Sequence, residues 1–248
     1  MTDFALQEVK RIIQSSENIV FFGGAGVSTA SHIPDFRSAG GLYQRMTGIH
    51  FAAEEMLSHD FLIAHADLFY QNLRENLVFP DAQPNPAHRA LVKLEQLGKL
   101  KAVITQNIDG LHQKAGSKNV IELHGSMDHF YCMNCYKQFT LNDVLKFETV
   151  PCCDRCNGII RPDIVLYQES LDQEVIQNAI EYIISADVFI IGGTSLVVYP
   201  AAGLLQYYRG DKMILINRDP TPFDQRADYV LSGDIAIILP ELVDLPMG

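Results

Sequence analysis

A short apolar stretch, Ile19 to Phe22, runs directly into the glycine-rich sequence Gly23-Gly24-Ala25-Gly26. This pattern predicts a buried strand that ends in a tight turn. Because glycine has no Cβ atom, the backbone N–H groups of such a turn can close on a phosphate. The turn therefore favours a nucleotide-binding fold, although a simple connection between a strand and a helix would use the same residues.

The residues after this turn depart from the pattern of a dehydrogenase. Thr29 stands where the third glycine of a G-x-G-x-x-G fingerprint would be. No acidic residue follows at the end of a second strand about twenty residues on, where a dehydrogenase would hold the ribose. The chain continues instead with Pro34-Asp35-Phe36-Arg37, which brings an acid, an aromatic ring and a permanent cation together. We interpret this segment as a loop that acts on the bound nucleotide.

Further along the chain, apolar strands alternate with amphipathic helices. Helices are predicted near the N-terminus, where Leu6 and Val9 share a face, after Pro86 and after Asp172. Residues 43–79 show mixed helical patterns without a clear strand. The predicted strands are residues 19–22, 102–105, 120–123, 188–191, 213–216 and 229–231. This alternation predicts an α/β fold with a Rossmann-like parallel sheet and helices on both faces.

Polar and glycine residues gather where these strands end. In a parallel sheet the carboxyl ends of the strands face one cleft, and ligands bind there. The segments at such ends are Gly23–Ser28, Gln106–Asp109, His124, Gly193–Ser195 and Asn217. We therefore expect these segments to line one binding site.

Two of these segments also have a plainer interpretation. Gln106, Asn107 and Asp109 could bind a carboxamide and ribose hydroxyls, or Asn107 and Asp109 could cap the next helix. His124 could act as a general base near neutral pH, or it could be a buried or capping histidine. The residues taken one by one do not separate these alternatives.

The cysteines all fall within residues 132–156. Cys132-Met-Asn-Cys135 and Cys153-Asp-Arg-Cys156 form two C-x-x-C pairs, a spacing typical of a tetrahedral zinc site. Four thiolates leave no open position for water, so the predicted zinc is structural. Cys152 is spare, and it could compete with Cys153, which gives the better two-residue spacing. The pattern predicts a small zinc ribbon inserted into the α/β fold.

The charge balance limits the partners. The formal net charge of the 248-residue chain is −11, which argues against general nucleic-acid binding and favours a basic protein or peptide. The uncharged run Val188 to Tyr208 has the length of a membrane span, but Gly192-Gly193 and Pro200 interrupt it. We expect a strand, a loop and the start of a helix there. With no apolar signal segment at the N-terminus, a cytoplasmic protein without a membrane partner is expected.

Taken together, these segments resemble the sirtuin family of NAD-dependent protein deacylases, in its compact bacterial form. The match runs in order along nearly the whole chain, and the ordered set is far more specific than any one motif. The motifs are Gly24-Ala25-Gly26-Val27-Ser28, Ile33-Pro34-Asp35-Phe36-Arg37, Gln106-Asn107-Ile108-Asp109, His124-Gly125, the four cysteines, Arg161-Pro162-Asp163-Ile164-Val165, Gly193-Thr194-Ser195-Leu196 and Ile216-Asn217.

The resemblance implies a role for each motif. His124 would be the catalytic base, and Cys132, Cys135, Cys153 and Cys156 would hold one structural Zn²⁺. The residues that would contact NAD, a cosubstrate consumed in the reaction, are Ala25, Thr29, Phe36, Arg37, Gln106, Asn107, Ile108, Asp109, His124, Thr194, Ser195, Asn217 and Ile235.

The acylated lysine would enter a tunnel formed by Ile164, Val165, Tyr167 and a strand at Val197–Val198. The substrate peptide would add as a further strand between Gln168-Glu169 and that segment. The resemblance also implies one catalytic domain over residues 1–248. Its parts would be a Rossmann-like core of about 1–36, 85–127 and 160–248, a helical insertion of about 37–84 and a zinc ribbon of about 128–159.

The implied activity is NAD-dependent protein-lysine deacetylation. The acetyl group of acetyl-lysine in a protein or peptide would pass to ADP-ribose, with release of nicotinamide and O-acetyl-ADP-ribose. Alternatives are a protein mono-ADP-ribosyltransferase, a longer-chain deacylase and, from another class, an NAD-binding sensor module stabilised by zinc. No specific nucleic-acid partner is expected.

This chain departs from the family pattern at a few positions. His32 and Gln168 replace glycines that are usual in the cofactor loop and beside the peptide site. Members that remove succinyl or malonyl groups carry a Tyr-x-x-Arg pair. Here Tyr70 is followed at that spacing by Leu73, and Arg74 comes one place late. We therefore expect acidic acyl groups to be poor substrates.

Overall fold

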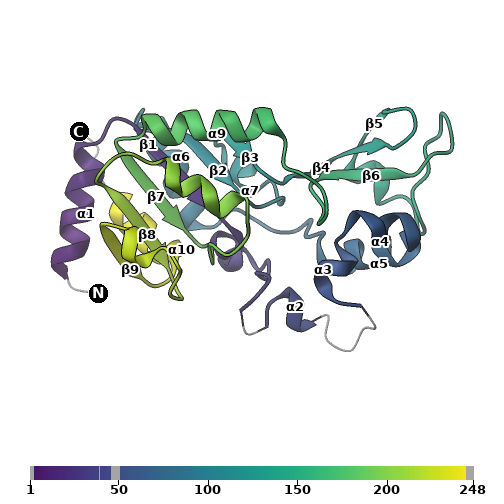
Figure 1. The fold of residues 1–248 in the computed structure, drawn as a ribbon, viewed down its shortest axis with the longest axis horizontal. Coiled ribbons are helices and arrows are strands. Elements are labelled where there is room, and N and C mark those ends of the chain that lie inside the picture. Colours follow the sequence, from purple (N-terminus) through teal and green to yellow (C-terminus); the bar gives the residue numbers. More distant parts are fainter. Residues whose placement is uncertain (1–2, 39, 46–50, 244–248) are drawn as a thin grey trace.

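The computed structural model describes residues 3–38, 40–45 and 51–243. A six-stranded sheet and a three-stranded sheet follow each other along the long axis of the molecule (Figure 1). The larger sheet contains β1 (Ile19–Gly23), β2 (Leu100–Thr105), β3 (Val120–Glu122), β7 (Val188–Gly192), β8 (Met213–Asn217) and β9 (Tyr229–Ser232). The smaller sheet contains β4 (Gly125–Cys132), β5 (Gln138–Thr140) and β6 (Ile160–Ile164).

Helices and short 3₁₀ turns connect these strands. The helices are α1 (Asp3–Ser15), α2 (Leu42–Arg45), α3 (Ala53–Met56), α4 (His59–Ala64), α5 (Ala66–Asn76), α6 (Pro86–Gln96), α7 (Leu111–Ala115), α8 (Leu141–Val144), α9 (Gln173–Ser185) and α10 (Ile235–Val243). The 3₁₀ turns are η1 (Ala25–Val27), η2 (Thr29–Ser31), η3 (Ala201–Tyr207) and η4 (Asp224–Arg226).

The strands of the larger sheet are all parallel, in the order β3-β2-β1-β7-β8-β9. The chain steps outward from β1 through β2 to β3 on one side, and from β7 through β8 to β9 on the other. The direction of winding therefore changes between β1 and β7, where Gly23 pairs with Gly192. Ligands bind outside the carboxyl ends of the strands at such a point. The predicted α/β class and parallel sheet are confirmed.

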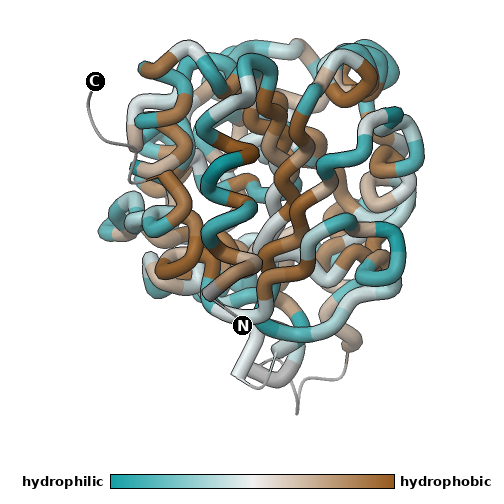
Figure 2. The backbone as a smooth tube through the Cα atoms, turned by 90° about the vertical axis from the view of Figure 1, so that its left-hand side faces the viewer, coloured by the Kyte–Doolittle hydropathy of each residue, from teal (hydrophilic) through white to brown (hydrophobic). Residues whose placement is uncertain are grey.

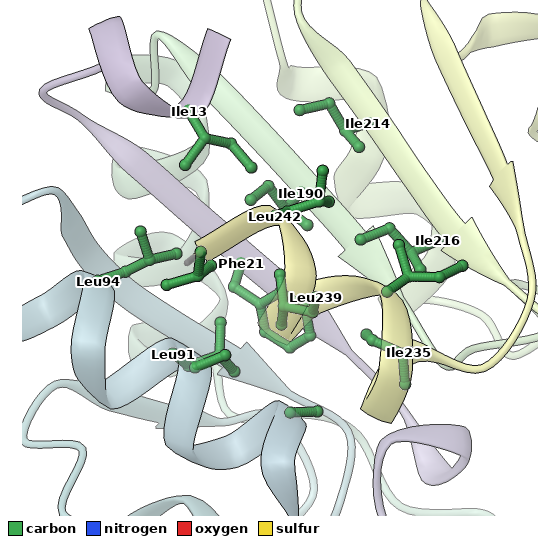
Figure 3. Close-up of a cluster of buried hydrophobic side chains, with 14 of the residues drawn as sticks. Ile13, Phe21, Leu91, Leu94, Ile190, Ile214, Ile216, Ile235, Leu239 and Leu242 are labelled. Atoms are coloured by element: carbon green, nitrogen blue, oxygen red, sulfur yellow. The ribbon is translucent and has the colours of Figure 1, made fainter. Parts of the chain in front are cut away.

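Helices α1, α6 and α10 cover one face of this sheet. Phe21, Ile190 and Ile216 project from the strands and pack against Leu94 and Leu239 (Figure 3). All five side chains are fully buried. Full burial of a side chain of this size contributes about 1.5–3 kcal/mol, so this cluster is a main source of stability for the sheet.

Helix α9 and η3 cover the opposite face. Phe22 and Phe189 meet edge to face there, with ring centroids 6.4 Å apart, and Ala179 and Ile183 of α9 pack onto the same cluster. Viewed from the α1 end, hydrophobic segments run through the middle of the molecule between more hydrophilic outer turns (Figure 2). The expectation of helices on both faces is confirmed.

The helices begin where the sequence provides caps. Asn85 accepts a hydrogen bond from the Ala87 N–H at 2.9 Å, and Pro86 occupies the first turn of α6. Asp172 accepts hydrogen bonds from the Glu174 and Val175 N–H groups at the start of α9. A cap of this kind contributes about 0.5–2 kcal/mol, which explains why both helices begin at the predicted residues.

The three-stranded sheet and helices α2 to α5 share a separate core. Tyr70, Phe130 and Ile160 are fully buried in it. The sheet is antiparallel, and its strands β4 and β6 reach from Gly125 to Ile164. It thus extends beyond residues 128–159, the predicted limits of the zinc ribbon, because β6 pairs with β4 along its length rather than joining the parallel sheet.

The structure differs from the sequence predictions near the C-terminus. Val197 and Val198 lie in irregular backbone, so the strand predicted there is wrong. Gly193 and Leu196 have φ values of 60° and 55°, and these left-handed turns prevent an extended strand. After Pro200 the chain forms η3. A further helix, α10, was not predicted; the carboxylate of Asp234 accepts a hydrogen bond from the Ala236 N–H at its start, at 2.8 Å.

No helix in the described part of the chain has both the length and the apolar character needed to cross a membrane.

Two buried histidines lie under β1. His88 of α6 and His112 of α7 have ring centroids 4.7 Å apart, and His112 also packs against Phe21. Among the described residues, neither ring nitrogen of His112 has a hydrogen-bond partner, and the same holds for Nε2 of His88. Burial lowers the pKa of His88 to about 4 and that of His112 to about 3, from an ordinary value of 6.5. Both rings are therefore neutral at pH 7.

These histidines should make the fold sensitive to acid. Since their pKa values are lowered by folding, the unfolded chain takes up protons first as the pH falls. The contribution of the two neutral histidines to the free energy of unfolding is complete above pH 6.5. It is lost towards pH 4, at roughly 1.4 kcal/mol per pH unit for each histidine. Urea unfolding from pH 7.5 to 4.5 should show a smaller loss of stability in His112→Leu than in the wild type. The exposed His129→Leu serves as the control; equal slopes for His112→Leu and the wild type would contradict the prediction.

Candidate active site

A cavity of about 530 Å³ lies at the carboxyl ends of the parallel strands and extends to the edge of the smaller sheet. It gathers almost all of the predicted site residues, from loops far apart in the sequence. Those that line it are Ala25, Thr29, Phe36, Arg37, Gln106, Asn107, Ile108, Asp109, His124, Ile164, Val165, Tyr167, Thr194, Ser195, Asn217 and Ile235. Val197 does not line it; Val197 is 47% exposed, and its neighbour Val198 takes the place at the wall.

Two glycine loops meet at the floor of this cavity. The Gly26 N–H donates to the Gly193 carbonyl at 2.7 Å. A Cβ on Gly26 would lie 2.8 Å from that carbonyl oxygen, and one on Gly193 would lie 2.4 Å from the Val27 nitrogen. Side chains cannot be fitted at these positions without moving the backbone. The absence of side chains at Gly26 and Gly193 therefore lets the ends of β1 and β7 approach closely, and it also leaves room for a ligand.

A buried polar network connects the first of these loops to β2. Ser28 donates to the Asp109 carboxylate at 2.6 Å and accepts from the Asn107 side chain at 3.1 Å. The Leu111 N–H donates to the other Asp109 oxygen at 2.9 Å, at the start of α7. Asp109 thus caps the next helix, as the plainer interpretation had it, while it also lines the cavity. Ser28 was not among the predicted site residues, although it stands directly after the glycine turn.

The carboxylate of Asp109 is in a low-dielectric environment. Burial raises its pKa, and the hydrogen bonds from Ser28 and the Leu111 backbone work in the opposite direction. A carboxyl group that is buried, hydrogen-bonded and turned towards a cavity can bind an amide group of a ligand.

Gln106 links the β2 end to the second glycine loop. Its side-chain amide donates to the Thr194 hydroxyl at 3.0 Å, and its backbone N–H donates to the Gly23 carbonyl at 3.0 Å. The ends of β1, β2 and β7 are therefore joined by side-chain and backbone hydrogen bonds around one opening. This arrangement holds the cavity wall in place before any ligand enters.

His124 stands at the junction of the two sheets. One ring nitrogen, Nδ1, lies 2.8 Å from the Gln106 carbonyl oxygen. Since a carbonyl can only accept, Nδ1 carries the proton and Nε2 is left with a free lone pair. Burial lowers the pKa of the imidazole, and the hydrogen bond to Gln106 opposes this. His124 is therefore a neutral imidazole at pH 7 and is suited to accept a proton.

The loop at residues 33–38 closes one side of the cavity. It is held by backbone hydrogen bonds from Leu42 and Tyr43 to the carbonyls of Asp35 and Phe36, at 2.7 and 3.0 Å. The rings of Phe36 and Tyr43 meet edge to face, and the Arg37 guanidinium lies 5.3 Å from the Tyr43 ring centroid. His32, which precedes this loop, has φ 64°, the left-handed conformation that the usual glycine would adopt.

Further polar residues that were not predicted stand at the far end of the cavity. Arg218 and Asp234 both line it, and they form an ion pair at 2.8 Å. Arg218 directly follows Asn217, so its place after β8 could have indicated it. Asp234 could have been found as the cap of α10, had that helix been predicted.

The Tyr70 and Arg74 side chains lie away from the cavity. The Tyr70 hydroxyl donates to the Ile160 carbonyl, and Arg74 donates to the carbonyls of Phe147 and Thr149. Neither residue is part of the cavity wall. Ile164 and Val165, which do line the cavity, are apolar.

The four cysteines of the two C-x-x-C pairs come together in the smaller sheet. Their sulfur atoms all lie within 4.8 Å of one another. The two loops have the same geometry: the Asn134 N–H points to Cys132 Sγ and the Arg155 N–H to Cys153 Sγ, each at 3.4 Å. A tetrahedral set of four thiolates fits a structural zinc and leaves no ligand position for water. The spare Cys152 is outside the cluster.

Comparisons with known proteins agree with this arrangement. A family model described as the Sir2 family matches residues 24–200. An NAD-dependent protein deacetylase of Clostridium acetobutylicum is 54% identical over 96% of this chain and 98% of its own. Among solved structures, a complex described as Sir2, a p53 peptide and NAD⁺ is 40% identical, with a TM-score of 0.85 over 96% of this chain and 97% of that one. Another, with an inhibitor, 2′-O-acetyl-ADP-ribose and a deacetylated p53 peptide, is 40% identical with a TM-score of 0.83 over the same shares.

Loss of one zinc ligand should unfold the zinc module. We expect Cys132→Ala to lose bound zinc and to lower the melting temperature by roughly 5 °C or more, because metal binding contributes directly to folding. Zinc content and thermal unfolding of the purified protein measure this. Cys152→Ala is the matched control and should keep one zinc. Full zinc content with an unchanged melting temperature in Cys132→Ala would refute the four-cysteine site.

Proposed function

The chain belongs to the Sir2 family of NAD-dependent protein deacetylases, and on this premise we propose that the cavity around His124 is its active site. There the acetyl group of an acetylated lysine passes to the ADP-ribose part of NAD, and nicotinamide is released. The products are the free lysine, nicotinamide and O-acetyl-ADP-ribose. NAD is thus a cosubstrate that is cleaved, and the zinc has a structural role.

One observation carries this proposal. His124 lies where the strand-end loops of the parallel sheet and the segment after β6 face the same cavity. The Val165 N–H donates to the His124 carbonyl at 3.0 Å, so the two parts meet directly at this residue. The neutral imidazole, with Nε2 free, is placed between a side suited to a nucleotide and a side suited to an acyl chain. A plain sensor would need no base there, and a dehydrogenase would need an acidic residue for the ribose at the end of a second strand, which this sequence lacks.

On the nucleotide side, each group has a task that its surroundings support. The Gly24 and Gly26 N–H groups are bonded to the carbonyls of Gly192 and Gly193, so Ala25 is the residue of this turn that would offer its backbone N–H to a phosphate. Asn107 would contact the ribose and Asp109 the nicotinamide carboxamide, and Ser28 is hydrogen-bonded to both side chains. Ser195 and Asn217 would hold the adenosine half. Phe36 would screen the reactive ribose carbon from water, which would otherwise compete with the acyl oxygen.

On the acyl side, Ile164, Val165 and Val198 form an apolar wall. The amide oxygen of an acetylated lysine is a weak nucleophile, so it must be held in line with the ribose carbon while the bond to nicotinamide breaks. Positioning of this kind can supply a large part of the rate. His124 Nε2 then accepts the proton of a ribose hydroxyl, and that oxygen attacks the acyl carbon. The bond from the acyl carbon to the lysine nitrogen breaks, so lysine leaves as the free amine, and one water adds to the acyl carbon to leave the acetyl ester on ADP-ribose.

We further propose that the whole chain acts as a single catalytic domain in the cytoplasm. The zinc cluster needs four reduced thiols, and a reducing compartment keeps them so. The net charge of −11 favours basic peptides over nucleic acids as partners.

Removal of the base should abolish turnover while the fold remains. We expect His124→Ala to lower the rate of nicotinamide release from NAD and an acetyl-lysine peptide by roughly 10²–10⁴-fold. The exposed His129→Ala should retain the wild-type rate. In the wild type, the rate should fall on the acid side only below the ordinary pKa of histidine, because burial lowers the pKa of His124. A folded, zinc-loaded His124→Ala with the wild-type rate would rule out this role.

Selectivity for the acyl group follows from the apolar wall. An acidic acyl group would bury its carboxylate against this apolar wall with neither Tyr70 nor Arg74 to bind it, since both side chains are engaged elsewhere. We expect kcat/KM for a succinyl-lysine peptide to be at least roughly tenfold lower than for the acetyl-lysine peptide of the same sequence. Equal values for the two peptides would disprove this interpretation of the pocket.

A further inference from the structure

Gln168 lies in a strained conformation beside the cavity. Its φ is 77°, in the left-handed region that glycine adopts readily and other residues adopt at a cost. It lines the cavity next to Tyr167 and Glu169. Strain of this kind persists only where the surroundings hold the residue, and it gathers at functional sites. The contacts of this side chain therefore indicate why a glutamine is present.

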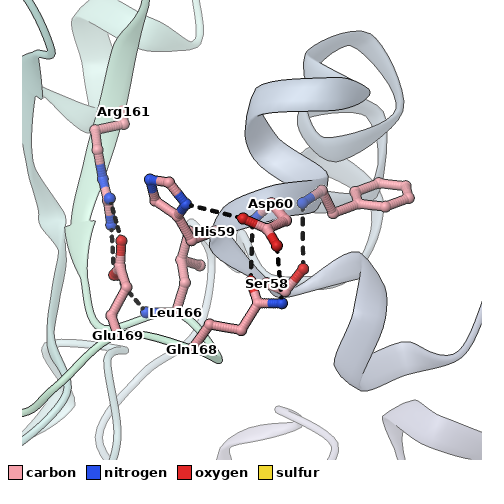
Figure 4. Close-up of polar contacts among 8 residues, drawn as sticks. Ser58, His59, Asp60, Arg161, Leu166, Gln168 and Glu169 are labelled. Atoms are coloured by element: carbon pink, nitrogen blue, oxygen red, sulfur yellow. Dashed lines mark hydrogen bonds and ion pairs between the residues drawn. The ribbon is translucent and has the colours of Figure 1, made fainter.

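The side chain of Gln168 makes a two-point contact with helix α4. The Asp60 N–H donates to Gln168 Oε1 at 3.1 Å, and Gln168 Nε2 donates to Asp60 Oδ2 at 3.2 Å (Figure 4). One bond uses the backbone at the start of the helix and the other its carboxylate. Glycine could adopt the same backbone conformation but could form neither bond.

The neighbouring residues fasten the same segment to other elements. The Tyr167 N–H donates to the Leu57 carbonyl at 3.0 Å, and the His59 N–H donates to the Tyr167 carbonyl at 3.1 Å. The Glu169 carboxylate pairs with the buried Arg161 and also accepts from the Leu166 N–H at 2.9 Å (Figure 4). Residues 166–169 are thus held between β6 and the helical insertion.

The backbone of Gln168 itself remains available. Its own N–H and C=O have no hydrogen-bond partner within the part of the chain that the structure describes. Free backbone groups on a segment that is fastened along its other side can pair with an extended peptide, as an added strand does.

We propose that Gln168 is a positioning residue for the acetylated peptide. Its amide fastens residues 166–169 to α4 through Asp60, so that the backbone of this segment is ordered before the peptide arrives. This inference rests on the proposed function, because it assumes that the peptide enters along this segment. A glycine at position 168 would adopt the same left-handed backbone conformation, whereas the Gln168 side chain also fastens the segment to α4.

The contact between Gln168 and Asp60 contributes to the order of residues 166–169 more than to the stability of the fold. The Asp60 side chain is 79% exposed, and contacts between such exposed groups add little to stability. Glycine at position 168 would also relieve the left-handed strain, which offsets the loss of the two bonds. The effect of removing the side chain should therefore appear in peptide binding and not in the melting temperature. A segment that must be ordered during binding lowers the affinity for its ligand.

The experiment compares four variants of the full-length, zinc-loaded enzyme. These are Gln168→Gly, Asp60→Ala, the double variant of both, and Asp60→Asn, which keeps an oxygen acceptor for the Gln168 amide. Gln177→Ala is the matched control, since Gln177 makes a similar exposed contact with Glu181 on α9, at 3.0 Å. Steady-state rates with an acetyl-lysine peptide and NAD give kcat and both KM values, and thermal unfolding gives the melting temperature.

We expect Gln168→Gly to raise KM for the peptide by roughly five- to tenfold, with kcat and KM for NAD within about twofold of the wild type. Asp60→Ala should raise the peptide KM by a smaller factor, because the backbone N–H of residue 60 keeps its bond to Gln168. The double variant should be no worse than Gln168→Gly alone, because the glycine already removes both bonds. Asp60→Asn and Gln177→Ala should keep the wild-type KM for the peptide. The melting temperature of Gln168→Gly should equal that of the wild type.

An unchanged peptide KM in Gln168→Gly, or additive increases of the peptide KM in the double variant, would overturn the inference. Turnover by the wild type in the same assay would leave the proposed function intact. Absence of wild-type turnover would overturn both.

Discussion

The close approach of two glycine loops, between β1 and β7, is the constraint on which the rest of the structure depends. The Gly26 N–H bonds to the Gly193 carbonyl at 2.7 Å, at the point where the winding of the parallel sheet changes direction. A Cβ on either residue would collide with backbone atoms of the other loop. Because no side chain separates the loops, the strand ends stay close together and both loops line one cavity. A nucleotide site at this point is a consequence of the sheet order and of two missing side chains.

The other residues proposed for the reaction lie on segments that surround this opening. The end of β2 contributes Gln106, Asn107 and Asp109, and Ser28 ties this segment back to the glycine turn. His124 follows β3 and leads straight into β4, so the proposed base stands where the parallel sheet passes into the zinc-bearing sheet. The smaller sheet, which carries the four cysteines, thereby affects the cavity indirectly. Through β6 it positions residues 164–169 at the cavity wall. In the proposed reaction, nucleotide and peptide meet at the His124 imidazole because the two sheets are joined at that residue.

The sequence predicted those features that depend on one segment at a time. Apolar strands, the helix starts at Pro86 and after Asp172, and the four cysteines each follow from residue type and spacing, and all were confirmed. The sequence also predicted that distant strand ends line one cavity, but the individual contacts between distant segments were missed. Ser28 could not be paired with Asp109 from spacing, nor Gln168 with Asp60, because each pair joins elements that only the tertiary fold brings together. The strand expected at Val197–Val198 fails for a different reason: the left-handed residues Gly193 and Leu196 are set by the packing of the loop and not by β propensity. Helix α10 was overlooked, although Ile235, Ile238, Leu239 and Leu242 have helical spacing.

In the proposed function, NAD cleavage and acetyl removal are one reaction in one cavity. The fate of the acetyl group tests this. A peptide with a deuterated acetyl group on lysine is incubated with NAD and the enzyme, and the products are separated by mass spectrometry. The account predicts that the deuterated acetyl group appears on ADP-ribose, in equal amounts with free nicotinamide and deacetylated peptide. Release of the label as free acetate while NAD remains intact would contradict it.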